Sequence, residues 1–114
     1  MAVKLNTKAF EHAKALIREG KVVHDERDDW SEHAPSTDDQ NDYLEKHGFG
    51  DYSEWFLGVD DDKSEKTKGR YSFPFGDFSR VHRCAVISLE SRAAQNDHDD
   101  IATAAKDLLE RIDK

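Results

Sequence analysis

Residues 71–94, YSFPFGDFSRVHRCAVISLESRAA, hold the densest apolar run of the chain, its only cysteine and a well-marked helix start. The residue before Pro74 is pushed out of the helical region, so we expect residues 73–75 to be extended. A glycine then permits a turn, and Asp77 is suited to cap a helix because its carboxylate accepts from the free amides of the first turn. The stretch therefore predicts a strand end, a turn and a central helix over residues 77–94.

At about 100° per residue, this predicted helix presents one apolar face to the core. The apolar residues on that face are Phe78, Val81, Ala85, Val86, Leu89 and Ala93. His82 lies in the middle of the face and Arg92 at its edge, so each needs a polar partner if it is buried. One interpretation is a small anion site with His82 as the base, and the other is a structural polar contact. The further candidate binding residues of this stretch are Arg80, Arg83 and Asp77.

The other apolar patterns predict three more helices and two strands. The expected helices span residues 7–19, 38–47 and 99–112, and the expected strands span residues 54–59 and 69–75. The strands should form an antiparallel hairpin under the 77–94 helix, which should pair with the last helix because their linker is short. The sequence thus predicts a mainly helical α+β fold, a single domain over residues 1–114 with about four helices and a two-stranded antiparallel hairpin.

Several residues mark where the predicted helices begin and end. Asn6 or Thr7 can cap the first helix, and Gly20 follows its last turn. Residues 37–40 have the form of a capping box, and Gly48 closes the second helix. These signals support the helix assignments independently of the apolar pattern.

The chain has 114 residues and a formal net charge of −8, and its acids are concentrated in residues 25–66. Two segments, residues 25–37 and 60–68, are predicted to be acidic loops. An acidic surface repels phosphate, so direct binding of nucleic acid is disfavoured. No apolar run is long enough to cross a membrane, and the start lacks a signal-peptide pattern. A single cysteine fits a reducing compartment, so we expect a cytoplasmic protein.

Metal and cofactor sites are not expected from the sequence. Six histidines and one cysteine are present, but the histidines lack the paired spacing of zinc ligands. His82 and Cys84 are two residues apart and would point to different sides of the predicted helix. No residue is assigned as catalytic, because there is no nucleophile motif and no glycine-rich phosphate loop.

Three aromatic residues in an acidic setting form a candidate interaction patch. These residues are Trp30, Tyr52 and Trp55. Aromatic side chains are frequent at protein-binding surfaces, although in a small domain they also build the core. Trp30 is expected to anchor the first acidic loop by folding back onto the domain.

The block FPFGDFSRVHRCAVISLESRAAQNDHDDI, residues 73–101, carries an FPFGDFxxVHRC pattern. It resembles a block of small, functionally uncharacterised proteins of bacteria and archaea. It is also distantly similar to terminal segments of phage-related structural proteins. The resemblance covers about a quarter of the chain and implies a recurring structural unit, without an activity to carry over.

The sequence favours a non-catalytic, acidic binding or accessory protein, with another protein as its partner. One alternative is a small enzyme or anion-binding domain that uses His82 and Arg92. Another is an acidic mimic of nucleic acid that occupies a basic protein through residues 25–66. The sequence does not determine a substrate or an oligomeric state.

Overall fold

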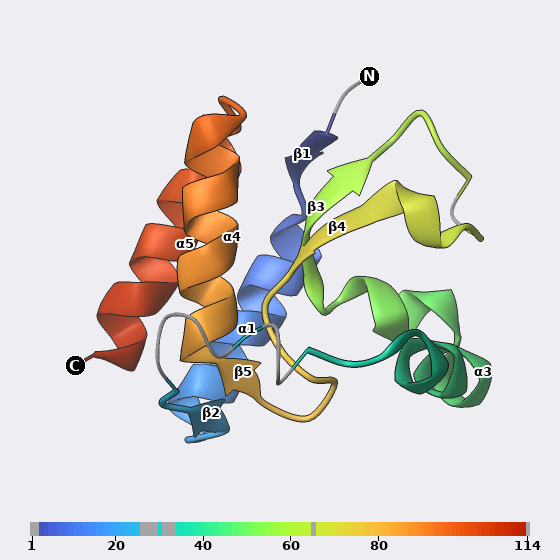
Figure 1. Cartoon of the computed structure of the whole chain (residues 1–114), viewed down its shortest axis with the longest axis horizontal. Coiled ribbons are helices and arrows are strands. Elements are labelled where there is room, and N and C mark those ends of the chain that lie inside the picture. Colours follow the sequence, from blue (N-terminus) through green and yellow to red (C-terminus); the bar gives the residue numbers. More distant parts are fainter. Residues whose placement is uncertain (1–2, 26–29, 31–33, 65, 114) are drawn as a thin grey trace.

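The computed structural model describes residues 3–25, 30, 34–64 and 66–113, and within these ranges the chain forms an α+β fold (Figure 1). Its α-helices are α1 (Thr7–Arg18), α3 (Thr37–Ser53), α4 (Arg83–Gln95) and α5 (Asp99–Ile112). Its strands are β1 (Val3–Leu5), β2 (Val22–Val23), β3 (Phe56–Asp60), β4 (Tyr71–Pro74) and β5 (Val81–His82). A short 3₁₀ helix, η1 (Lys68–Arg70), precedes β4. The expected α+β class is therefore confirmed.

The main sheet has three antiparallel strands in the order β1-β3-β4. β3 is the central strand, and all five of its residues are buried. The expected pairing of β3 with β4 is present, but the prediction of a two-stranded hairpin is wrong because β1 pairs with the other edge of β3. A strand of three residues is too short to show the alternation by which strands are recognised.

The prediction of a helix starting at residue 77 is also wrong, since α4 begins at Arg83. The two preceding residues form β5, which pairs in parallel with β2. There the amide of Val81 donates to the carbonyl of Lys21 at 3.0 Å. Phe78 has a φ of 69°, which is incompatible with a right-handed helix. Backbone pairing with a distant segment thus replaces the first turn of the expected helix.

The second helix is longer than residues 38–47, because α3 continues to Ser53. Gly48 interrupts it with φ 79° and ψ 173°, so the expected stop signal acts as a kink between two helical segments. The capping box lies one residue earlier than predicted. The Ser36 side chain accepts from the Asp39 amide at 3.1 Å, and the Asp39 carboxylate accepts from the Ser36 amide at 3.3 Å.

The first and last helices agree with the sequence prediction. The side chain of Asn6 caps α1, and Gly20, with a φ of 78°, follows the end of that helix. α5 spans the predicted residues. No described helix is long and apolar enough to cross a membrane.

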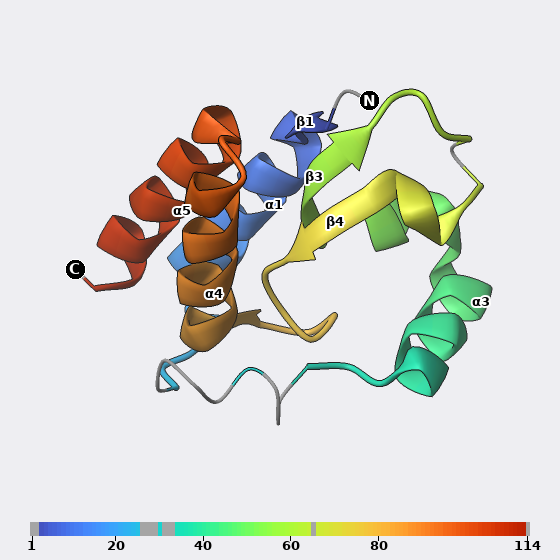
Figure 2. The same ribbon diagram turned by 45° about the horizontal axis from the view of Figure 1, so that its top comes forward.

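Figures 1 and 2 show α4 and α5 side by side at one end of the molecule, with the three-stranded sheet in the middle and α3 at the opposite end. α1 packs against α5 and β3 and so joins the helical layer to the sheet. The largest fully buried side chains are Tyr52, Phe75, Leu57, Ile101, Leu108, Val81, Val86 and Cys84. The core is therefore continuous from the helix pair to the second half of α3.

Candidate functional site

A polar cluster, buried except for the partly exposed Asp77, surrounds His82 at the end of β5. We define the His82 cluster as Asp25, Asp77, His82 and Cys84. Nδ1 of His82 lies 2.7 Å from Oδ2 of Asp25, and Nε2 lies 2.7 Å from Oδ2 of Asp77. A doubly protonated imidazole satisfies this geometry, because it donates to both carboxylates at once.

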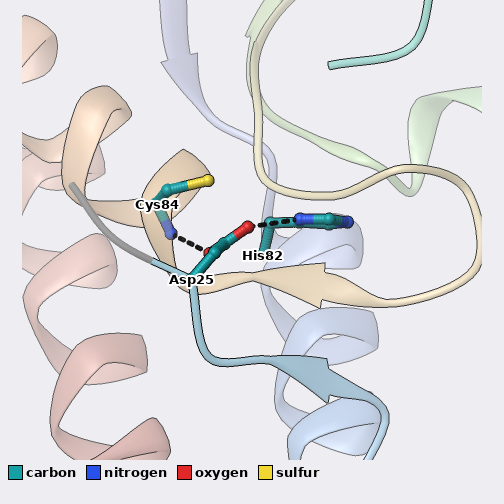
Figure 3. A group of neighbouring side chains, drawn as sticks. All are labelled: Asp25, His82 and Cys84. Carbon is teal, nitrogen blue, oxygen red and sulfur yellow. Dashed lines mark hydrogen bonds and ion pairs between the residues drawn. The ribbon is translucent and has the colours of Figure 1, made fainter. Parts of the chain in front are cut away.

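Asp25 connects His82 to the start of α4. Its second oxygen, Oδ1, accepts from the backbone amide of Cys84 at 2.8 Å, and Figure 3 shows its carboxylate between that amide and the imidazole ring. Asp25 and His82 meet because β2 and β5 are parallel and Val23 lies opposite His82. Asp25 was not predicted as a site residue, because it is one of fifteen acids in residues 25–66 and no motif distinguishes it.

Asp77 holds the other side of the ring from a tight turn. Its Oδ1 accepts from the amides of Ser79 at 3.0 Å and Arg80 at 2.9 Å, so Asp77 caps this turn and not a helix. Burial acts to raise the pKa of Asp77. The hydrogen bonds from His82 and from the two turn amides outweigh that effect and hold the pKa below its usual value.

The structure separates the three residues of the expected aromatic patch. Trp30 is half-buried, and its ring centroid lies 5.5 Å from that of His82, so it folds back onto the domain as predicted. Tyr52 and Trp55 are only 2% and 3% exposed and belong to the core. These two side chains therefore do not form a surface patch with Trp30.

The candidate arginines do not converge on His82. Arg80 is exposed, and Arg83 makes two contacts with the carboxylate of Asp113, at 2.9 and 3.2 Å. Arg92 is exposed on α4 and lines a cavity of about 30 Å³ that does not include His82. Of the candidate binding residues, only Asp77 contacts His82 through its side chain within the described ranges.

His82 and Cys84 lie closer together than the predicted helix would place them. A helix that contained both residues would point their side chains to different sides, whereas His82 lies in the extended strand before α4. The ligand atoms of Asp25, His82 and Cys84 all lie within 4.8 Å of one another, and all three residues are buried (Figure 3). This part of the cluster contains the donor types that bind transition metals.

A sizeable cavity lies away from the His82 cluster, between the start of α1, the second half of α3 and the edge of the sheet. It measures about 520 Å³, within the range of ligand pockets. We call it the basic cleft and define it by Lys8, Phe49, Asp61, Lys66, Arg70 and Tyr71. The rings of Phe49 and Tyr71 lie side by side, 6.3 Å apart and tilted by 29°.

Among the described residues that line the cleft there are three cations and one carboxylate, and Lys8 also lies 3.7 Å from Glu54 just outside it. That carboxylate, Asp61, contacts Lys4 at 2.5 Å and Arg70 at 3.3 Å. The hydrogen bond from Lys4 lowers the pKa of Asp61, against a smaller opposing effect of desolvation. The first turn of α1, which lines the cleft, has no acidic residue to offset the positive end of the helix.

No family model, curated protein or solved structure matches the chain. The resemblance of residues 73–101 to a block of prokaryotic and phage-related proteins stays a prediction. Inference about function therefore rests on the geometry of the cluster and the cleft.

Proposed function

We propose that the protein is a non-catalytic binding protein whose basic cleft receives an acidic segment of a partner protein. The observation that carries the proposal is a positively charged, aromatic-lined cleft on a chain of net charge −8. A cationic site on an acidic molecule favours anionic groups locally while the remaining surface repels them. This arrangement favours a ligand with a few carboxylates close together, which can enter the cleft without bringing further negative charge near the rest of the surface.

Arg70 is the group best suited to hold such a carboxylate. Its side chain is 16% exposed, and Nη1 donates to the carbonyl of Lys63 at 2.7 Å while Nη2 contacts Asp61. These contacts fix the guanidinium before a ligand arrives and so reduce the entropy lost on binding. Lys8, whose side chain is 60% exposed, and Lys66 add positive charge at the rim.

Phe49 and Tyr71 favour a peptide segment over a free inorganic anion. Both are half-buried, so they present apolar surface beside the cations. Tyrosine, phenylalanine and arginine are enriched at surfaces that bind proteins. An acidic segment with an apolar side chain would use both kinds of surface.

The geometry of His82 gives little support to the alternative of a small enzyme. A general base needs a free nitrogen within reach of its substrate, but both ring nitrogens of His82 are occupied by carboxylates. Cys84 is fully buried, which disfavours a nucleophilic role. The described cavity that Arg92 lines does not include His82.

The alternative of a nucleic-acid mimic has less support as well. Such a mimic needs carboxylates that are free to imitate phosphates, whereas several described acids make local contacts. Asp39 caps its own helix, Glu54 lies 3.7 Å from both Lys8 and His12, and Asp61 contacts Lys4. These contacts reduce the charge that residues 25–66 can offer to a basic partner.

The cleft is tested by NMR titration with a hexapeptide of alternating glutamate and phenylalanine. We expect the amide resonances of Gly50 and Tyr71 to shift, and the affinity to fall as sodium chloride is added. Arg70→Gln should weaken binding about 10- to 100-fold, because a hydrogen bond to a charged group contributes about 1.5–3 kcal/mol.

Arg92→Gln is the matched control, since it removes the same charge from an exposed site outside the cleft. It should bind the peptide as the wild type does. Equal binding of a peptide with glutamine in place of glutamate, or equal weakening by both substitutions, would contradict the proposal. If inorganic phosphate alone shifts the same resonances at similar concentrations, the ligand is a free anion and not a protein segment.

A further inference from the structure

We propose that Asp25, His82 and Cys84 form a binding site for a divalent transition-metal ion of the zinc type, separate from the basic cleft. The three residues contribute one carboxylate, one imidazole and one thiol, all buried and with ligand atoms within 4.8 Å of one another. Zinc is bound in proteins by these three donor types. Calcium and magnesium prefer oxygen donors alone, so the donor set selects against them.

The distances between the three ligand residues are compatible with a metal ion in place of the proton that Asp25 and His82 share. Zinc lies about 2.0–2.3 Å from its ligands, so two tetrahedral ligand atoms are roughly 3.3–3.7 Å apart. Oδ2 of Asp25 and Nδ1 of His82 are 2.7 Å apart, a hydrogen-bond distance that has to widen by roughly half an ångström or more. The thiol of Cys84 lies within 4.8 Å of one carboxylate oxygen of Asp25 and one ring nitrogen of His82, which leaves a small side-chain adjustment.

Asp77 supplies the outer partner that a metal-bound histidine needs. A histidine that binds metal through one nitrogen usually donates its other N–H to a carboxylate, which fixes the orientation of the ring. Nε2 of His82 lies 2.7 Å from Asp77, whose other oxygen is held by the amides of Ser79 and Arg80. The ring is thus oriented with Nδ1 toward Asp25.

The hydrogen bond between Asp25 and residue 84 does not require a thiol. Asp25 holds Cys84 through its backbone amide, which any residue except proline supplies. The metal site uses the thiol itself. Substitution of the Cys84 side chain therefore separates the two roles, because it keeps the amide contact and removes a ligand.

Binding conserves the charge of the buried cluster. Zinc binds a thiolate and a neutral imidazole nitrogen, so the ion displaces the proton of the Cys84 thiol and the Nδ1 proton of His82. Two protons leave as one divalent ion enters, and the Nε2 proton stays directed at Asp77. Metal binding should therefore release about two protons per ion.

The test is a titration of the chelator-treated full chain with Co²⁺ and then Zn²⁺, under reducing conditions. We expect one equivalent of Co²⁺ to produce a thiolate-to-cobalt absorption band, which Zn²⁺ abolishes, with about two protons released into weakly buffered solution. Cys84→Ser should lose the band and weaken zinc binding about 100-fold. Asp77→Asn should keep the band and weaken binding by about 10–100-fold, as expected for an outer partner.

His12→Gln is the control, because it removes a half-buried imidazole that lies outside the cluster and should leave the band and the affinity unchanged. Circular dichroism establishes that each variant is folded. If Cys84→Ser does not fold, two other measurements decide the outcome. These are the absorption band and the number of protons released in the wild type, and the loss of metal affinity in Asp77→Asn. Absence of a thiolate band in the folded wild type, or equal zinc affinity in the wild type and Cys84→Ser, would overturn the proposal.

Discussion

At the scale of single residues, Asp25 joins segments that are far apart in the sequence. Its carboxylate contacts His82, 57 residues away, and the amide of Cys84, 59 residues away. Removing a buried carboxylate leaves its charged or polar partner without an acceptor. The free energy of unfolding then typically falls by about 3–5 kcal/mol. The start of α4 therefore depends on a residue that follows β2.

Tyr52 gives a prediction about pH at the same scale. It is 2% exposed, and its hydroxyl donates to Oε1 of Gln40 at 3.2 Å. Burial, together with the nearby Tyr71, raises the pKa of Tyr52 above 10. When folding raises the pKa of a group, that group contributes to the stability of the folded protein. The contribution is complete at a pH below the unfolded pKa, and it is lost as the pH rises through the folded pKa.

We expect the free energy of unfolding of the wild type to fall above about pH 10, and that of Tyr52→Phe to fall less steeply. Near pH 7 the variant should be about 1 kcal/mol less stable, because it lacks the hydrogen bond to Gln40. Urea unfolding followed by tryptophan fluorescence at a series of pH values measures both effects. Parallel profiles for the two proteins would show that the phenol titrates alike in the folded and unfolded chain.

At the scale of elements, the interruption of α3 depends on one glycine. An added Cβ would meet nothing within 4 Å at either Gly48 or Gly50, but only Gly48 has a positive φ. Gly48→Ala should therefore destabilise the protein by about 1–2 kcal/mol. Gly50→Ala should be neutral or stabilise by up to about 1 kcal/mol, since alanine loses less entropy in a helix. Urea unfolding compares the two, and equal effects would contradict the kinked geometry.

The sequence predicted those elements whose signals are local. α1 and α5 carry regular apolar spacing, and their bounds were found to within one residue. β1 and the β2–β5 pair were not recognised as sheet partners, because strands of two or three residues have no pattern and are held by distant segments. The same distant pairing moved the start of α4 from residue 77 to Arg83.

The candidate sites were only partly predictable for a related reason. The sequence indicated that His82, if buried, needs a polar partner, and the structure places it between two carboxylates. It did not indicate Asp25, because nothing local distinguishes that acid from its neighbours. The cations of the basic cleft, Lys8, Lys66 and Arg70, come from separate elements, so no motif joins them.

At the scale of the whole molecule, the net charge of −8 predicts a dependence on salt. Like charges repel in the compact state, and salt screens that repulsion. Exposed ion pairs such as Lys4–Asp61 weaken in salt too, but pairs of this kind contribute little to stability. We therefore expect the melting temperature to rise as sodium chloride is raised from low to molar concentration.

The control for this prediction is the same titration near the pH at which the net charge vanishes, where the rise should be much smaller. Differential scanning calorimetry measures both series. A melting temperature that falls with salt near neutral pH would mean that ion pairs outweigh the net repulsion.

The pairing of early with late segments also has a consequence for synthesis on the ribosome. β1 pairs with β3, β2 pairs with β5, and α1 packs against α5, so residues 3–23 have their partners between residues 56 and 112. A nascent chain that has emerged only as far as α3 cannot bury these segments against their native neighbours. Folding should therefore occur late in translation, after an interval in which the emerging chain exposes apolar side chains to chaperones.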